Sequence, residues 1–365
     1  MPSFAPTEEQ EEIRRLAYSL ASEQLRPQGR AAEKSGDIPP SLLQTIAQTG
    51  LTTPFPEAYG GSGNLEAVTY ALIAEELAFG DGALALNMLS SMMAPVTVVL
   101  AGSQQQQEMY LPPFCAEKTA ATRRGSFAFA ERTGGYTLAE ISATVRKEGE
   151  KWILNGTKRD VIHGGNADLR VGLFRLEGSS GGEGLCAVVL PAQAEGMSMS
   201  SDTQKLGLIA APSVGYRFEN VAIPTDAMLG EPGSAGVRRA AAFYNILRAG
   251  VACGMARAGL DYASNYARER YAFGRPIVSY QGIAFILAEM AMKLDAARLL
   301  LWYAATLWDN GAADEELSKA AEAAQYQALK MSKSTTLDAI QVMGGAGFIQ
   351  DHPVEMWARN AAAME

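Results

Sequence analysis

The sequence has 365 residues, of which 48% are hydrophobic and 19% charged, ordinary values for a globular protein large enough for two or three domains. The net charge of −9 predicts no broad basic face for nucleic acid, and two histidines with three widely spaced cysteines show no metal-site spacing. The sequence shows no apolar signal segment and no apolar run long enough to cross a bilayer, so we expect a protein of the reducing cytoplasm.

The first third of the chain is predicted to be mainly helical. Thr7 and Gln10 have the spacing of a capping box, and the apolar stripe that follows them is expected to end at Pro27. Residues 65–79 and 84–100 also repeat apolar side chains at helical spacing. The second of these segments is apolar on nearly every face and is therefore expected to be buried.

The hydrophobic period changes near Ser126, and strands are predicted from there on. A strand over residues 152–154 is expected to run into a turn at Asn155-Gly156. Short clusters of β-branched and other apolar residues predict three further strands, over residues 169–176, 185–190 and 214–218.

The remainder of the chain is predicted to be helical again, over residues 237–270, 281–310, 314–343 and from about 353 to 365. The order of helices, strands and helices favours two helical lobes that flank a β domain over a doubly wound sheet. No G-x-G-x-x-G segment lies between a predicted strand and a helix, so a Rossmann nucleotide site is not expected.

The stretch 266–277 is predicted to end one long helix, break sharply and begin the next. Gly274 tolerates a positive φ, and Pro276 lacks an N–H group and disfavours helix in the residue before it. We therefore expect two antiparallel helices with a cationic, aromatic corner that contains Arg270 and Phe273. Taken alone, the same pattern also fits an ordinary helical hairpin whose arginines are solvated.

The sequence resembles the acyl-CoA dehydrogenase family in five segments, which occur in the family's order and cover nearly the whole chain. They are LTTPFPEAYGGSGN, IAEELAFGD, KLGLIAAPSVGYRFENVAIPTDAMLGEPGSAG, YARERYAFGRPIVSYQGIAFILAEMAMKLDAARLL and DAIQVMGGAGFIQDHPVEMWARNA. One such segment would be weak evidence, whereas the ordered set is specific.

The resemblance implies an α+β fold that is mainly α. It divides the chain into an N-terminal α-helical domain (1–120), a middle β-barrel-like domain (121–232) and a C-terminal four-helix bundle (233–365). It also implies an FAD-dependent oxidoreductase that desaturates an acyl thioester: a Glu takes the α-proton, and flavin N5 receives the β-hydrogen as hydride. A homodimer or homotetramer, and a flavoprotein as electron acceptor, would accompany this activity.

Six positions match FAD contacts of the family: Arg270, Phe273, Gln281, Gln341, Gly344 and Gly345. An arginine at a helix end can pair with a diphosphate in bidentate geometry, and glycines after a helix let a backbone approach a ligand. The resemblance assigns Arg270 to the FAD diphosphate and places Phe273 beside the cofactor. It assigns the segment 341–345 to FAD that is bound mainly by a neighbouring subunit. The alternatives are a solvated arginine and a simple glycine helix cap.

Two segments of the β block depart from the family's pattern. Ala130 and Tyr136 stand where the family has a Thr that binds the flavin ring and a Ser that touches the acyl-CoA. Asp160 and Ile162 stand where it has a Trp packed against the ring and a hydroxyl near flavin N5. These replacements are expected to weaken flavin binding or to alter the electronics of the ring. A surface carboxylate on a rearranged loop would explain Asp160 equally well.

The catalytic base of the family has no clear match. In most members the Glu falls about two helical turns beyond the pair that Arg359-Asn360 resembles, and this sequence ends at Glu365, too early for a match. In other members the Glu lies on the helix before the corner, next to an Arg. Those two positions are Tyr244 and Asn245 here.

Three interpretations therefore stay open. The protein is a flavin-dependent acyl-CoA dehydrogenase with an altered active site, or a binding relative of the same fold that has lost flavin chemistry. In the third, flavin is kept and the substrate is changed, for instance to an acyl group on a carrier protein or to a non-thioester acid or amine.

Overall fold

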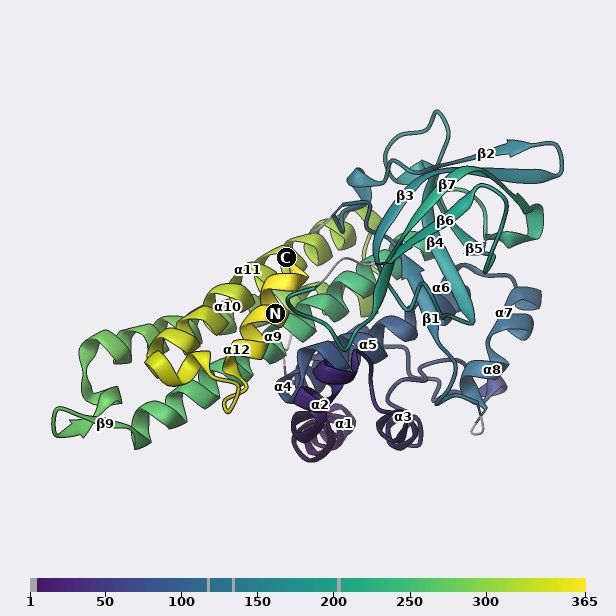
Figure 1. Cartoon of the computed structure of the whole chain (residues 1–365). Coiled ribbons are helices and arrows are strands. Elements are labelled where there is room, and N and C mark those ends of the chain that lie inside the picture. Colours follow the sequence, from purple (N-terminus) through teal and green to yellow (C-terminus); the bar gives the residue numbers. More distant parts are fainter. Residues whose placement is uncertain (1–4, 117–118, 133–134, 202–204) are drawn as a thin grey trace.

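The computed structural model describes residues 5–116, 119–132, 135–201 and 205–365. Long helices form an elongated bundle, a twisted sheet lies at one end of it, and the N-terminal helices pack below both (Figure 1). The fold is α+β and mainly α, as the sequence predicts. The N-terminal helices are α1 (Glu8–Leu20), α2 (Arg26–Ser35), α3 (Pro40–Ala47), α4 (Ala67–Gly80), α5 (Gly82–Ser91), α6 (Met93–Ala101), α7 (Gln104–Tyr110) and α8 (Pro112–Cys115).

Helix α1 begins as predicted but does not end at Pro27. The Thr7 hydroxyl accepts a hydrogen bond from the Gln10 N–H at 3.2 Å, and the Gln10 side chain accepts one from the Thr7 N–H at 3.0 Å, which completes the capping box. One π-helical turn, η1 (Ala21–Leu25), then leads directly into α2. Pro27 lies in the first turn of α2, where a missing N–H group is tolerated, so the proline does not break the chain.

The apolar segment that the sequence predicts as one buried helix is buried but broken. The expectation that no apolar run is long enough to cross a bilayer is wrong for Gly82–Ala101, which is long and apolar enough by composition alone, yet 83% of its apolar window is buried inside the protein. It divides at Met92 into α5 and α6. Both therefore serve as core helices between the sheet and the long bundle.

The β domain is an eight-stranded sheet with the strand order β6-β7-β3-β2-β4-β5-β8, and β1 pairs in parallel with β4. Aromatic and β-branched side chains such as Phe174, Phe218 and Val188 fill its core. The strands are β1 (Gly125–Ala128), β2 (Thr144–Glu148), β3 (Lys151–Ile162), β4 (Leu169–Leu176), β5 (Leu185–Leu190), β6 (Met197–Ser201), β7 (Ser213–Pro224) and β8 (Met228–Leu229).

The turn predicted at Asn155-Gly156 is wrong, because β3 runs straight through these residues. The pairing of β3 with β7 shifts in register between Leu154 and Gly156, which is the signature of a β-bulge. Gly156 has φ +126°, and a Cβ there would lie 2.7 Å from Ala143. The glycine therefore marks a bulge with a close backbone approach.

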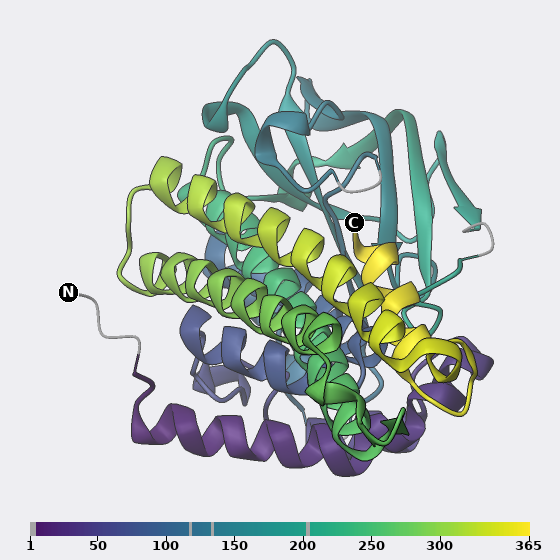
Figure 2. The same ribbon diagram turned by 90° about the vertical axis from the view of Figure 1, so that its left-hand side faces the viewer.

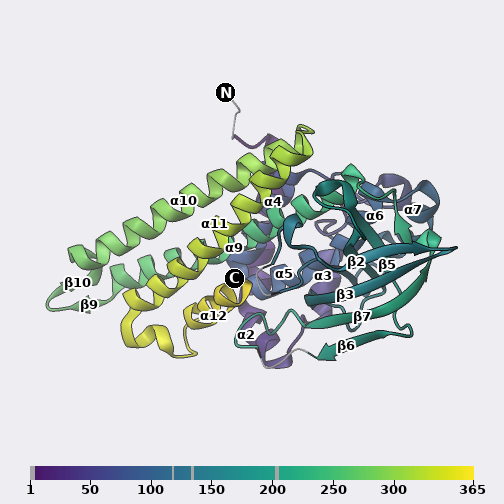
Figure 3. The ribbon, with the colours of Figure 1, turned by 90° about the horizontal axis from the view of Figure 1, so that it is seen from above.

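The C-terminal part contains the predicted antiparallel helices and their corner. Helices α10 and α11 lie side by side against α9, and α12 lies next to the end of α11 (Figure 2). The corner is a short hairpin, β9 (Tyr271–Ala272) with β10 (Arg275–Pro276), which projects from the far end of the bundle (Figure 3). The helices are α9 (Ala235–Glu269), α10 (Gln281–Asp309), α11 (Asp314–Met343) and α12 (Val354–Met364).

Helix α9 is held against α4 through two glycines one turn apart. A Cβ on Gly254 would lie 2.2 Å from the Glu75 carbonyl oxygen, and a Cβ on Gly250 would lie 2.7 Å from the Ala74 Cβ. Real Cβ atoms do not approach a backbone this closely, so the two helices can pack at this distance only because no side chain intervenes. The contact fixes α9 as the axis on which the bundle and the N-terminal helices meet.

The substitution Gly254→Ala is expected to destabilise the protein although alanine is the better helix former. Overpacking against the α4 backbone should lower the free energy of unfolding by about 1–3 kcal/mol, whereas the higher helix propensity of alanine should raise it by only ~1 kcal/mol. Gly259→Ala is the matched control on the same helix, since its Cβ would meet nothing closer than 3.5 Å. Urea unfolding should show a loss of stability for the first variant and none for the second; equal effects would contradict the close contact.

Candidate cofactor and substrate site

A cavity of about 140 Å³ lies where the β domain meets α5, α9 and α12. It is the point at which all three parts of the fold contribute side chains. The side chain of Asn360 joins two of these parts, because its Oδ1 accepts a hydrogen bond from the Leu208 N–H at 2.7 Å. The lining residues are Leu86, Tyr136, Asp160, Ile162, Lys205, Leu206, Gly207, Leu208, Ala211, Ser213, Arg248, Ala363 and Met364.

The positions at which the sequence departs from the family's pattern converge on this cavity. Tyr136, Asp160 and Ile162 line it directly. Asn245 donates a hydrogen bond from Nδ2 to the Tyr136 carbonyl at 3.0 Å, and the Tyr244 ring meets the Tyr136 ring at 5.9 Å. Five of the six departures thus lie in or beside one cavity, and the sixth, Ala130, does not line it.

Four aromatic rings pack together beside the cavity. They contact one another in a closed circuit, with ring centroids 5.5–6.0 Å apart and edge-to-face geometry; the four residues are Phe127, Phe129, Tyr136 and Tyr244. Each ring is at most 5% exposed. Aromatic pairs at these distances attract each other beyond the area that they bury. Of these four residues, which we call the aromatic box, Tyr136 lines the cavity, and the rings of Phe129 and Tyr244 pack against it.

A buried ion pair holds the strand end that carries Asp160 and Ile162. Lys158 is completely buried, and its Nζ lies 2.8 Å from Glu131 Oε1 and 3.2 Å from the Phe129 carbonyl oxygen. Burial lowers the pKa of Lys158 to about 8, although the Glu131 carboxylate acts in the opposite direction. The Arg159 N–H also donates to the Ala130 carbonyl at 2.8 Å.

Asp160 itself has an unusual backbone. Its φ is +53°, a left-handed conformation that non-glycine residues adopt rarely and at a cost in free energy. The carboxylate is partly buried at the edge of the cavity. The alternative of a surface carboxylate on a rearranged loop does not describe this position, because Asp160 lies within β3 and lines the cavity.

Removal of Glu131 should destabilise the protein more than removal of Lys158. Glu131→Gln leaves a fully buried ammonium without a counter-charge and should lower the free energy of unfolding by about 3 kcal/mol. Lys158→Met leaves a carboxylate that is 11% exposed and still accepts hydrogen bonds from Ser142 and Ala143. Urea unfolding at pH 7 measures both variants, and a larger loss for Lys158→Met would contradict this ranking.

Arg248 is the lining residue that the sequence reasoning missed. It lies on α9, is 3% exposed and has apolar neighbours on both sides, Ile246-Leu247 and Ala249-Gly250-Val251. A single charge inside an otherwise apolar helical stretch was the available signal, because a buried arginine requires a partner or a function.

The predicted cofactor residues gather at the opposite end of the bundle. One hydrophobic cluster contains Ala267 of α9, Leu287 of α10 and Met343 of α11, so the corner and the glycine turn after α11 belong to the same end. All six predicted residues are exposed there, and Phe273 is 98% exposed.

The chemistry of this end fits an anionic ligand such as a diphosphate. Arg270 forms no ion pair with any described residue. Gly344 has φ +61°, and a Cβ on Gly344 or Gly345 would meet nothing within 4 Å, so the turn is open to an approaching group. The residues present therefore suit the diphosphate part of FAD.

The six residues and the cavity lie far apart within one chain. Arg248 and Arg270 are separated by 22 positions on a continuous helix and its cap, which corresponds to about 33 Å at 1.5 Å per residue. Figure 3 shows the corner hairpin at one extreme of the bundle and the sheet at the other. The residues of one chain thus cannot hold the two ends of one cofactor molecule unless that molecule spans this distance.

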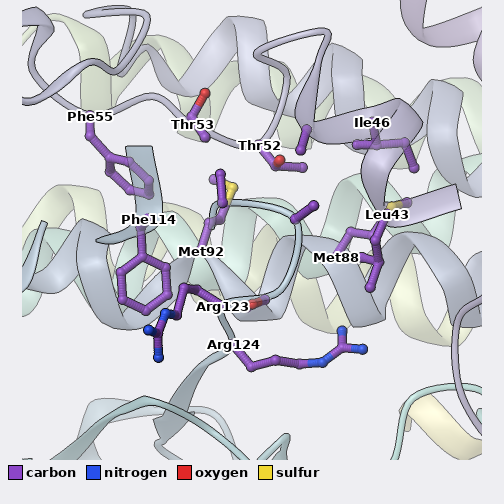
Figure 4. Close-up of a pocket in the computed structure, with 14 residues that line it drawn as sticks. Leu43, Ile46, Thr52, Thr53, Phe55, Met88, Met92, Phe114, Arg123 and Arg124 are labelled. Carbon is purple, nitrogen blue, oxygen red and sulfur yellow. The ribbon is translucent and has the colours of Figure 1, made fainter. Parts of the chain in front are cut away.

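A second pocket, beneath α3 and α5, is too small to hold an acyl group. Its cavity volume is about 40 Å³, enough for one or two water molecules. Phe55, Phe114 and Met92 crowd around it, and Arg123 and Arg124 lie along one side (Figure 4). Both arginines are engaged elsewhere, with Asp168 and Asp37.

Comparison with known proteins agrees with this geometry. Three family models match the chain in order: acyl-CoA dehydrogenase, N-terminal domain, at residues 7–118; middle domain at 126–221; and C-terminal domain at 234–365. A probable acyl-CoA dehydrogenase of Mycobacterium tuberculosis is 31% identical over 362 residues, which cover 98% of this chain and 91% of that protein.

Solved structures are similar over the whole chain. The butyryl-CoA dehydrogenase of Megasphaera elsdenii has a TM-score of 0.84 at 27% identity and covers 100% of this chain, which in turn covers 95% of it. The prolyl acyl carrier protein oxidase AnaB has a TM-score of 0.84 at 25% identity, with coverages of 99% and 95%. The fold and the site define an acyl-CoA dehydrogenase-like flavoprotein class. The chain belongs to the acyl-CoA dehydrogenase family.

Proposed function

We propose that this protein is an FAD-dependent dehydrogenase that introduces an α,β double bond into a short acyl thioester. The observation that carries this proposal is the cavity at the junction of the three parts of the fold, combined with an unpaired cationic corner on the same helix. Within the family, a site of this kind takes the acyl end of the substrate next to a flavin ring.

FAD would be held by the six predicted cofactor residues at the corner and the glycine turn: Arg270, Phe273, Gln281, Gln341, Gly344 and Gly345. When bound, FAD supplies a two-electron acceptor for hydride from the substrate. Arg270 would pair with the diphosphate, and the open glycine turn would let backbone N–H groups approach it. The side chains that line the cavity would exclude water and fix the orientation of the acyl group. Asp160 would oppose additional negative charge on the ring, because like charges repel strongly in a dry site.

A second copy of the chain would complete the site. Three exposed apolar side chains repeat every seven residues along α10, which gives the helix an uncovered apolar stripe: Phe285 at 67%, Met292 at 66% and Leu299 at 51% exposure. An uncovered stripe of this kind is typical of an interface between symmetric subunits. Such a dimer or tetramer would bring the corner of one copy to the cavity of another.

One observation favours a related substrate, an acyl group attached to a carrier protein. Tyr136, 5% exposed, occupies the position at which the family has a small Ser that touches CoA. The larger side chain is packed into the aromatic box and leaves less room for that contact. The structural similarity to a carrier-protein oxidase agrees with this alternative.

The visible absorption spectrum of the purified full chain tests the proposal. We expect bound flavin, and we expect its absorbance to be bleached under anaerobic conditions by a short acyl thioester on CoA or on a carrier protein. Arg270→Ala should weaken FAD binding by about ten- to a hundredfold, because a charge-assisted hydrogen bond to phosphate is lost.

Arg268→Ala is the matched control, since it removes the same charge two residues away, from a side chain that donates to Asn265. Arg268→Ala should keep the affinity for FAD within about twofold of the unsubstituted protein, because the contact between Arg268 and Asn265 is exposed. Colourless protein that takes up no added FAD would contradict the proposal and favour a binding relative without flavin chemistry.

A further inference from the structure

Arg248 brings a positive charge into the cavity without a described negative partner. Its guanidinium stacks on the Tyr136 ring at 3.7 Å, and Nη2 donates a hydrogen bond to the Met364 carbonyl at 2.7 Å. Its Nε is buried and has no hydrogen-bond partner. Among the described residues no carboxylate lies within ion-pair distance of it.

Two half-buried arginines of the bundle have carboxylate partners. Arg257 of α9 lies 3.2 Å from a Glu75 oxygen and also pairs with Glu76, and Arg298 of α10 lies 2.8 Å from Glu75. Both side chains are 20% exposed, more than Arg248, and are nevertheless neutralised by carboxylates of α4. An arginine that is 3% exposed and unpaired is costly to keep, and its unused donors suit a planar carboxylate.

Few charged side chains besides Arg248 line the cavity. The other titratable or charged ones are Asp160, Lys205 and Tyr136. Lys205 donates to the Ala211 carbonyl at 3.0 Å, and Asp160 is not within ion-pair distance of Arg248. No carboxylate of the described lining therefore pairs with Arg248.

The size of the cavity limits what can reach Arg248. Apolar side chains such as Leu86, Ile162 and Leu208 make up much of its lining. A dry protein cavity of roughly 150 Å³ accommodates one benzene molecule, that is, about six non-hydrogen atoms. The cavity here, at about 140 Å³, is of the same size. A chain of three methylene groups that ends in a carboxylate has six non-hydrogen atoms beyond the thioester carbonyl.

We propose that the cavity selects acyl groups that end in a carboxylate, and that Arg248 binds this carboxylate. The inference rests on the proposed function, because it names the substrate class of that site. The volume of the cavity limits the length of the chain, and Arg248 sets its charge. The substrate class is thus the monothioester of a dicarboxylic acid, and the proposal applies equally to CoA and to a carrier protein as the thiol partner.

Two matched probes test the inference by isothermal titration calorimetry on the full chain as purified. Both are thioesters of N-acetylcysteamine, the chemical end that CoA and carrier-protein arms share. One carries a glutaryl group. The other carries a 5-methylhexanoyl group, in which an uncharged isopropyl group replaces the carboxylate. The glutaryl probe should bind at least about tenfold more tightly.

Variants separate Arg248 from the rest of the cavity. Arg248→Met keeps a long, flexible side chain without charge and should abolish the preference for the glutaryl probe, whereas Arg248→Lys should retain part of it. Circular dichroism confirms that the variants fold, and the comparison of the two probes on the unsubstituted protein stands even if they do not. Free glutarate, titrated separately, shows whether the carboxylate alone suffices or the thioester is needed.

The inference is overturned if the two probes bind equally to the unsubstituted protein, if the neutral probe binds more tightly, if neither binds at millimolar concentration, or if the preference survives in Arg248→Met. Flavin bleaching reports on the proposed function separately. Bleaching by both probes without preference would refute the inference alone. A charge preference without bleaching would support the inference and count against dehydrogenation.

Discussion

The structure depends on one packing contact, the close approach of α9 to α4 at Gly250 and Gly254. This contact fixes a 35-residue helix that passes through every part of the site. Its first half carries Tyr244, Asn245 and Arg248 to the cavity, and its end presents Arg270 about 33 Å away. Because the helix is continuous, these two groups cannot approach each other within one chain. Under the proposed function, a second subunit would therefore be needed to bring the two groups to one cofactor.

Several residues that differ from the family's pattern lie next to one another. Tyr136 and Tyr244 are larger than the Ser and the Glu at the matching positions of the family, and their rings meet in the aromatic box. Arg248 stacks on Tyr136 and adds a positive charge. Under the proposed function, these neighbouring residues would change the specificity of one cavity together.

Much of the fold could be predicted from the sequence because hydrophobic period and helix length are local signals. The limits of α11, β4 and β5 are the predicted ones. Two errors have a local cause as well: Pro27 falls in the first turn of α2, where its missing N–H group is tolerated, and Gly156 lies in a β-bulge where a turn was expected. Of the site, the sequence could point to the residues that depart from the family. That most of them converge on one cavity, and that Arg248 has no carboxylate partner among the described residues there, depends on tertiary contacts between α9, β3 and α12.

The central claim is that one copy holds the ring end of the cofactor and another holds its diphosphate. Flavin content of mixed dimers tests it most directly. Subunits with Arg270→Ala lack the diphosphate contact, and subunits with Ala211→Trp carry a bulky side chain in the cavity beside which the flavin ring would lie; each variant alone should bind FAD at least about tenfold more weakly. Isolated dimers with one subunit of each kind should regain one intact site, that is, one FAD per dimer. Mixed dimers as empty as either parent would show that each site is built within a single chain.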